Sequence, residues 1–380
     1  MTQSLPARPD LWTLDPAVLH LNHGSFGAVP RRTQETAAAL RAETEADPMA
    51  WFRRLPDRLA SSRRALAGYL RTDPDGLVMV RNASAGITVA LSTVPIAEGG
   101  QIVLTDHVYG AVRIAAERIA RLRRAEVVTV AVPLESTADE AIDAFAAAVD
   151  ERTAVVVVDQ ISSETAAVFP AAEVVALCRR AGVPVIVDGA HAPGLLDEPV
   201  VDGADFWTGN FHKWPCAPRG TAALTVADRW RSRALPLIAS WAEHDPMPER
   251  FDWQATDDYV GWVAAPVSLE VLTELDWPRR RAQLSVMLDE AATQVAKSVG
   301  TTPPDVASPA PTMRLVELPV SWPRGDHAAG DAFKTRAAQE IGASLTVTAH
   351  GDRRYLRLSA HAYNAPRDYE LLAARLPALL

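Results

Sequence analysis

Cysteine is scarce in this chain of 380 residues, which contains only Cys178 and Cys216. Two cysteines cannot build the disulfide framework of a small secreted domain, and these two stand too far apart for the Cys-x-x-Cys spacing of a metal site. The sequence therefore predicts a protein that folds without disulfides or metal, in a reducing compartment.

Long apolar runs are also missing. The first residues, MTQSLPARPDLWTLDP, lack a positively charged start followed by an apolar segment, and no run of about 18 apolar residues occurs elsewhere. We therefore expect a cytoplasmic protein that makes no membrane contact.

Excess positive charge is the third absence. The net charge is -9, and the arginines at 279–281 are isolated among acidic neighbours, so no basic stripe forms. Nucleic acid is not an expected partner.

The length and composition suit one large domain plus a smaller one, since 48% of the residues are apolar and can supply a sizeable core. Short apolar runs alternate with segments that place apolar residues at i, i+3 and i+4, which indicates βαβ units and a doubly wound, mainly parallel sheet (α/β class). The six runs, each interpreted as a buried parallel strand, are GLVMV (76–80), QIVLT (101–105), EVVTVAV (126–132), AVVVVDQ (154–160), VPVIVD (183–188) and TAALTV (221–226).

A smaller α+β domain is expected after the alternating region. A helical stretch over 259–299 breaks at Trp277-Pro278, and a Pro-rich connector over 301–312 leads to a strand (313–320), a helix (330–342), two strands and a closing helix. The predicted division is an N-terminal segment 1–25 that packs with the small domain, a large domain 26–258, linking helices 259–300, and a small domain 301–380.

Polar residues follow several of the predicted strands, where an α/β sheet places its ligand. Ser84 stands in a segment that opens a helix, Tyr109 follows the second strand, and the strand VIVD ends on Asp188. A buried carboxylate needs a cationic or hydrogen-bonding partner. Lys213 stands among small residues some two dozen positions later.

These four features together match the needs of pyridoxal 5'-phosphate. Lys213 would carry the aldehyde as a Schiff base, and Asp188 would hold the pyridine nitrogen protonated. Tyr109 would stack on the ring, and the helix start at Ser84 would take the phosphate.

Two motifs resemble a known family. Asp-Gly-Ala-His (188–191) followed by Gly-Asn-Phe-His-Lys-Trp (209–214) is similar to the class V aminotransferases, which are fold-type I pyridoxal-phosphate enzymes, and the resemblance extends over about residues 18–378. LNHGSFGAVPR (21–31) and LRLSAHAYN (356–364) look most like the isopenicillin N epimerase branch.

The resemblance implies roles for further residues. Arg357, with its planar fork of donors, would bind the substrate α-carboxylate, and Thr256 would reach the phosphate of a partner subunit, which implies a homodimer with shared sites. The remaining assignments are Ala83, Ser84, Asn210 and His212 at the phosphate, His191 and Ser163 near the ring's 3-oxygen, and His23, Gly24 and Ser25 at the substrate.

Several reactions stay open at this level. Each would begin when Lys213 takes the α-proton of an amino acid. We favour β-elimination, as in a carbon–sulfur lyase acting on a bulky sulfur-linked amino acid in secondary metabolism, because it requires only a leaving group and an open site.

Epimerisation is the alternative, and it needs a second acid, for which Tyr109 and His23 are candidates. Transamination, decarboxylative deamination and a catalytically silent binding protein are further alternatives. Persulfide chemistry is disfavoured, since no cysteine lies between Ile341 and Arg357. Trp51, Phe52, Trp241 and Trp253 suggest an aromatic rim for a large substrate.

Overall fold

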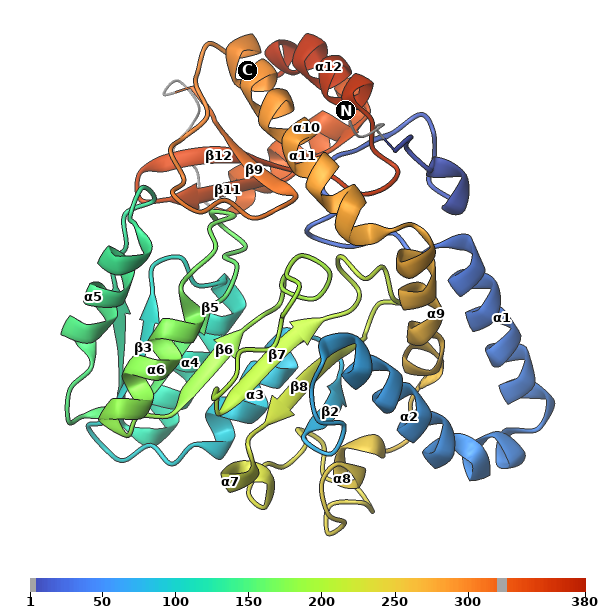
Figure 1. Cartoon of the computed structure of the whole chain (residues 1–380), viewed down its shortest axis with the longest axis vertical. Coiled ribbons are helices and arrows are strands. Elements are labelled where there is room, and N and C mark those ends of the chain that lie inside the picture. Colours follow the sequence, from blue (N-terminus) through green and yellow to red (C-terminus); the bar gives the residue numbers. More distant parts are fainter. Residues whose placement is uncertain (1–4, 320–326) are drawn as a thin grey trace.

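Two sheets of unequal size organise the chain. The structure, a computed structural model, describes residues 5–319 and 327–380, with the backbone alone at 327 and 328. Residues 1–4 of the predicted N-terminal segment and Val320 of a predicted strand lie outside the described residues. Figure 1 shows the large sheet in the lower body and the small sheet above it, with the helix α10 (Trp277–Ser298) rising from the junction of the two along the small unit.

The large sheet has seven strands in the order β2-β8-β7-β6-β5-β3-β4. All six predicted runs form strands of this sheet, and a seventh, FWTGN, was not predicted because it lacks a run of β-branched residues. The strands are β2 (Leu77–Val80), β3 (Gln101–Thr105), β4 (Glu126–Val130), β5 (Thr153–Asp159), β6 (Val185–Asp188), β7 (Phe206–Asn210) and β8 (Ala222–Val226).

One strand direction differs from the prediction. β8 pairs antiparallel with both β7 and β2, whereas β7, β6, β5, β3 and β4 form parallel pairs. The loop from β7 to β8 contains no crossover helix, and adjacent strands joined without a crossover must run antiparallel. The predicted parallel direction of TAALTV was therefore wrong.

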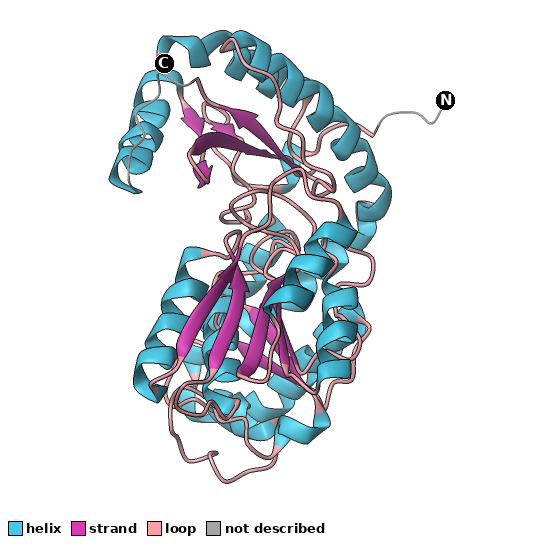
Figure 2. Ribbon diagram, turned by 90° about the vertical axis from the view of Figure 1, so that its left-hand side faces the viewer, coloured by secondary structure: helices cyan, strands magenta, loops and turns pink. Residues whose placement is uncertain are grey.

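Helices cover both faces of the large sheet, as Figure 2 shows from the side. α3 (Ala83–Thr93) and α4 (Gly110–Arg123) pack on one face, while α2 (Pro48–Leu70), α5 (Ala138–Ala148) and α6 (Ala171–Ala181) pack on the other. In β5, Val155 and Val157 pack into the core beneath α3 and α4, whereas Val156 and Val158 pack into the core on the opposite face. Burial on both faces explains why the strands are continuous apolar runs.

Local signals fix several helix ends. Asn82 caps α3 by accepting a hydrogen bond from the Ala85 main chain at 2.9 Å. Thr137 and Glu140 form a capping box at the start of α5. α6 ends on Gly182, which adopts the left-handed conformation expected of a glycine C-cap.

The small unit has a three-stranded antiparallel sheet in the order β11-β12-β9. The chain reaches it through α9 (Val260–Glu274) and α10, so the predicted break at Trp277 is confirmed. Its elements are β9 (Met313–Glu317), α11 (His327–Ile341), β10 (Ala343–Ser344), β11 (Val347–His350), β12 (Arg353–Ser359), α12 (Pro366–Arg375) and η2 (Leu376–Ala378).

The N-terminal segment joins the two units. Its strand β1 (Leu19–His20) pairs in parallel with β10 of the small unit. The chain then continues into α1 (Arg31–Ala46), which packs against α9. The segment thus crosses the boundary where the functional site lies, while the predicted domain limits stay a prediction.

Candidate active site

The carboxyl ends of the parallel strands meet the small unit around a cavity of about 530 Å³, which we call the strand-end cavity. Segments far apart in the sequence contribute to it, from the N-terminal segment to β12. Twelve of the fourteen predicted site residues line it: Gly24, Ser25, Ala83, Ser84, Tyr109, Ser163, Asp188, His191, Asn210, His212, Lys213 and Arg357. The two that do not are His23 and Thr256.

Lys213 lies three residues after the end of β7 and contacts His191. Its Nζ is 2.7 Å from Nε2 of that imidazole, and the indole NH of Trp214 lies 3.3 Å from Nδ1. An indole NH only donates, so Nδ1 accepts and the proton of a neutral His191 stays on Nε2. That proton points at Nζ, which can accept it only as a neutral amine.

The electrostatics agree with this assignment. Burial lowers the pKa of His191 well below its usual range, so the ring stays neutral. Burial and the nearby Arg357 guanidinium together lower the pKa of Lys213 to about 7, although Asp188 and Glu164 oppose the shift. A lysine with this pKa is about half deprotonated at pH 7, so a neutral amine is available as a nucleophile or base.

Asp188 is the last residue of β6 and is only 3% exposed. Its Oδ1 accepts a hydrogen bond from the Ala190 main chain at 2.9 Å. Burial raises its pKa, while this hydrogen bond and the Lys213 charge lower it. The carboxylate is therefore held at the floor of the strand-end cavity, where a protonated ring nitrogen would complete its pairing.

The start of α3 forms the polar end of the cavity. The main-chain NH of Ala83 donates to Oδ1 of Asn210 at 2.9 Å, which ties this helix start to the end of β7. Among the residues that the structure describes, none accepts a hydrogen bond from the main-chain NH of Ser84. A free NH at a helix N-terminus suits a phosphate, and His212 lines the same cavity.

Tyr109 and Phe26 supply the aromatic surface. Tyr109 is 44% exposed and Phe26 is 69% exposed, although both line the cavity. Tyr109 is thus an aromatic surface open to a planar ligand and not a core residue. Phe26 was not predicted, because no sequence pattern distinguishes a phenylalanine in a loop.

The predicted aromatic rim is wrong. Trp51 is buried in a small core with Arg58 over its ring, and Trp253 packs against Phe52. Trp241 is 95% exposed and does not line the strand-end cavity. Periodicity and composition could not distinguish packing aromatics from a rim.

Arg357 projects from β12 into the cavity and is only 2% exposed. Its guanidinium donates to the carbonyl and hydroxyl oxygens of Ser163 and to the hydroxyl of Ser25 at 3.1 Å. Its Nε has no hydrogen-bond partner among the described residues. Burial lowers the pKa of Arg357 to about 10, so it stays charged at neutral pH and its charge calls for an anionic ligand.

His23 does not reach the cavity, in contrast to its predicted substrate role. It is 1% exposed, its Nδ1 lies 2.8 Å from the Tyr363 hydroxyl, and its Nε2 lies 3.1 Å from the Lys213 carbonyl oxygen. Burial lowers its pKa to about 3. With both nitrogens engaged and no charge, His23 is not positioned to contact substrate.

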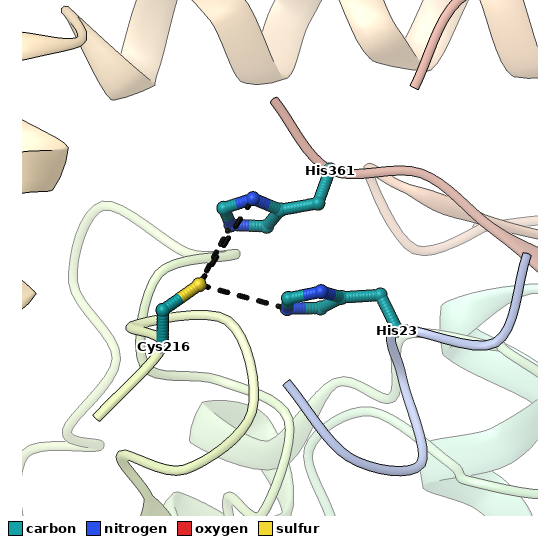
Figure 3. Close-up of side chains that lie close together, drawn as sticks. All are labelled: His23, Cys216 and His361. Carbon is teal, nitrogen blue, oxygen red and sulfur yellow. Dashed lines mark hydrogen bonds between the residues drawn. The ribbon is translucent and has the colours of Figure 1, made fainter. Parts of the chain in front are cut away.

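His23 belongs to a buried cluster with Cys216 and His361, drawn in Figure 3. The sulfur lies 3.5 Å from Nε2 of His361 and 4.0 Å from Nε2 of His23. The two imidazole rings stack at 4.1 Å with an interplanar angle of 15°. A metal bound through both Nε2 atoms would lie well outside both ring planes, so this geometry does not suit a metal.

The cluster instead holds the lysine loop. His23 and His361 lie 3.1 Å from the carbonyl oxygens of Lys213 and Trp214 through their Nε2 atoms. The main-chain NH of Gly27 donates to the His212 carbonyl at 2.9 Å, and the Ser268 hydroxyl donates to that of Cys216 at 3.0 Å. The N-terminal segment, α9 and the small unit therefore all fix the backbone that carries Lys213.

Thr256 is exposed, lies between α8 (Glu249–Asp252) and α9, and does not line the strand-end cavity of its own chain. Its predicted contact therefore needs a second subunit. Close to it, Asp257 pairs with Arg81, a cavity residue that was not predicted. Other lining residues that sequence reasoning missed are Asp159, Glu164, Arg219, Gly220 and Lys334.

The residues present suit pyridoxal phosphate. A lysine of lowered pKa, a buried carboxylate and a free helix NH surround one cavity, and two buried polar atoms of its lining, Asp159 Oδ2 and Arg357 Nε, lack partners among the described residues. Lys213, Asp188 and Ser84 would hold the aldehyde, the ring nitrogen and the phosphate, respectively.

Comparisons with known proteins agree with this geometry. The family model described as aminotransferase class-V matches residues 51–253. The chain is 31% identical to isopenicillin N epimerase of Streptomyces clavuligerus, over 96% of each chain. It is 28% identical to a probable L-cysteine desulfhydrase of Arabidopsis thaliana, over 94% of this chain and 82% of that one.

Solved structures share the fold. The cystine C–S lyase C-DES in complex with cysteine persulfide has a TM-score of 0.79 and 20% identity, covering 95% of this chain and 97% of that chain. A cysteine desulfurase from Thermococcus onnurineus has a TM-score of 0.78 and 16% identity, covering 100% of this chain and 99% of that chain. These likenesses establish a fold-type I α/β architecture.

The chain belongs to the aminotransferase class-V family. The predicted family, fold class, enzyme nature and pyridoxal-phosphate cofactor are thereby confirmed. Across residues 5–319 and 327–380, no helix combines the length and apolarity that crossing a bilayer requires.

Proposed function

We propose that this enzyme catalyses a carbon–sulfur β-elimination on a sulfur-linked amino acid, with pyridoxal phosphate as cofactor. The observation that carries the proposal is that two groups line the same cavity: a lysine whose pKa is about 7, and the buried Arg357 guanidinium. One base and one carboxylate anchor are the protein groups that elimination requires. Relatives named as cysteine desulfhydrases support the same reaction class.

Arg357 would bind the substrate α-carboxylate. Its position on the rigid strand β12 and its contacts with Ser163 and Ser25 hold the guanidinium in one orientation. The carboxylate would bind where the guanidinium lines the strand-end cavity. The substrate would then be held at two points, with its Cα–H directed toward Lys213.

Lys213 would take the α-proton at Nζ. When bound, pyridoxal phosphate supplies an electron sink for the electron pair that this proton leaves behind. Asp188 would keep the ring nitrogen protonated, and His191 would donate its Nε2 proton to the ring's 3-oxygen once Nζ is engaged elsewhere. Tyr109 would cover one face of the ring, while Ser84, Ala83, Asn210 and His212 would surround the phosphate.

Elimination is favoured over epimerisation because epimerisation needs a second proton donor in the cavity, whereas elimination does not. Epimerisation needs a proton donor on the face opposite Lys213, and His23 lies behind the lysine loop with both nitrogens engaged. Of the two candidate donors, only Tyr109 lines the cavity.

Epimerisation stays the second candidate because two relatives of about 30% identity over nearly the whole chain are isopenicillin N epimerases. In that case Tyr109 would donate the second proton. A Tyr109→Phe variant would then lose inversion but keep deuterium exchange with retention, whereas an eliminating enzyme would keep forming its products.

The test is an incubation of the cofactor-loaded protein with S-conjugated cysteines and a panel of other amino acids in deuterated buffer. We expect pyruvate, ammonia and a released thiol, detected by NMR and mass spectrometry. Deuterium at Cα with inverted configuration and no thiol would instead establish an epimerase. An α-keto acid that keeps the thioether would indicate transamination.

We also propose a homodimer with shared sites in the cytoplasm. Thr256 is exposed and does not line its own cavity, which supports the sharing, because its family role requires the phosphate of a second subunit. A monomer that binds cofactor with full affinity would contradict the dimer.

A further inference from the structure

Asp159 is a second carboxyl group at the floor of the strand-end cavity, beside Asp188. It ends β5 as Asp188 ends β6, and the two residues are register partners in neighbouring parallel strands. Register partners point to the same face of a sheet and lie about 4.8 Å apart along the hydrogen-bonding direction. Both side chains are nearly inaccessible, at 2% and 3% exposed, and both line the cavity.

The hydrogen bonding of the two carboxyl groups differs. Asp188 accepts from the Ala190 main chain through Oδ1. Oδ2 of Asp159 is buried and has no hydrogen-bond partner among the described residues. An ionised oxygen in that position would pay the full cost of desolvation, whereas a protonated one could donate to a neighbouring carboxylate.

The charges around the pair place the proton. Asp159 faces Asp188 from β6 and Glu164 from the loop after β5, and burial together with these two charges raises its pKa well above the usual range. The main-chain NH groups of Asp159 itself and of Tyr109 oppose this rise only in part. The Ala190 NH and the charge of Lys213 both lower the pKa of Asp188 and so stabilise its ionised form. Two adjacent buried carboxyl groups share one proton, and it belongs on Asp159.

We propose that Asp159 is a positioning residue of the cofactor site: it remains protonated, donates its hydrogen bond to Asp188, and so leaves one ionised carboxylate to pair with a protonated pyridine nitrogen. The inference rests on the proposed role of Asp188. It adds that the floor of the cavity carries a single negative charge, which balances the single positive charge of a pyridinium, although two aspartates stand there.

This arrangement has a functional consequence. A carboxyl group that donates to Asp188 fixes the orientation of that carboxylate, as outer-shell groups orient the ligands of other sites. It also limits how strongly Asp188 attracts a proton, so that the ring nitrogen and not the aspartate holds it. Asn is the neutral isostere that keeps a donor at this position, whereas Leu has similar bulk without one.

The experiment is infrared difference spectroscopy of the dimeric or monomeric holoenzyme as purified, labelled with ¹³C in the aspartate side chains. We expect a C=O stretching band of a protonated aspartic acid at neutral pH that disappears in Asp159→Asn. The band should persist in the control Asp205→Asn, because Asp205 is buried outside the cavity and pairs with Arg229. In Asp188→Asn the band should remain but titrate at lower pH, since the neighbouring charge is gone.

Cofactor affinity gives the second readout, measured by fluorescence titration of the cofactor-free protein with pyridoxal phosphate. We expect Asp159→Asn to stay within about threefold of the parent, and Asp159→Leu and Asp188→Asn to weaken binding by about tenfold or more. A missing acid band, or one that survives in Asp159→Asn, would overturn the proposal. So would a loss of affinity in Asp159→Asn equal to that of Asp188→Asn, because Asp159 would then act through its charge.

The two proposals fail in different ways. If Asp188→Asn binds pyridoxal phosphate as tightly as the parent, the pyridinium assignment fails, whatever the infrared band shows. If Asp188→Asn weakens binding and no acid band is present, the assignment of Asp188 stands and that of Asp159 falls.

Discussion

Lys213 should destabilise the cofactor-free protein at neutral pH, and Lys213→Met should remove that cost. The pKa falls from 10.5 to about 7 on folding, because the side chain is buried near the positive charge of Arg357. At about 1.4 kcal/mol per pH unit, holding the proton below pH 7 costs the folded state up to about 5 kcal/mol. Water in the cavity screens the charge, so this value is an upper bound.

The sign follows from proton binding in the two states. Between pH 7 and 10.5 the unfolded chain holds the lysine proton and the folded chain releases it, so stability rises with pH across this window. Below pH 7 the full cost is present, and above 10.5 it is gone. Lys213→Met should therefore be more stable than the parent at pH 7, and the difference should shrink toward pH 10.

The assay is chemical unfolding of the cofactor-free protein and of Lys213→Met at a series of pH values, followed by circular dichroism. The difference between the two proteins isolates the lysine from other titrating groups. Arg357→Gln should raise the lower limit of the window and Asp188→Asn should lower it, since these residues shift the folded-state lysine pKa in opposite directions; the upper limit, set by the unfolded chain, should not move. A stability difference that does not change with pH would refute the reasoning.

Three further outcomes follow from the same contacts. Covalent attachment of pyridoxal phosphate to Lys213, followed by absorbance, should reach half its maximal rate near pH 7, and an increase continuing to pH 10, as for a free lysine model compound, would contradict the lowered pKa. Thr256→Ala should weaken cofactor binding in a dimer, and unchanged affinity would remove the basis for shared sites. Gly27→Ala should cost about 1–3 kcal/mol of stability, because a Cβ there would lie 2.2 Å from the Lys213 carbonyl oxygen. Its control, Gly68→Ala, has open space in α2 and should be neutral or stabilising by up to about 1 kcal/mol in thermal unfolding.

Strand-end chemistry was readable in the sequence because the rule for α/β sheets is local. A run such as VPVIVD marks a buried strand, and its last residue must stand at the carboxyl edge. Asp188, Tyr109 and Ser84 could be placed in this way. Asp159 ends the run AVVVVD by the same rule, so the signal was present there, but its significance depends on which strand lies beside it.

Strand order and chain crossing were not readable, because they depend on contacts between distant segments. β5 and β6 are neighbours whose register pairs Asp159 with Asp188, and β8 runs antiparallel because no helix separates it from β7. The motif LNHGSFG did not distinguish His23 from Ser25 as a substrate contact. In the folded chain Ser25 accepts a hydrogen bond from Arg357, whereas His23 lies against the Lys213 carbonyl oxygen.

The sequence by itself determined the sheet class, the family and the lysine, carboxylate and arginine of the site, since each of these is encoded by local pattern and residue type. Only the tertiary structure decided which groups share a proton, which histidine faces the cavity and how the lysine loop is held. Burial and mutual distance set those properties, and both arise from separate segments of the sequence that meet only when the chain is folded.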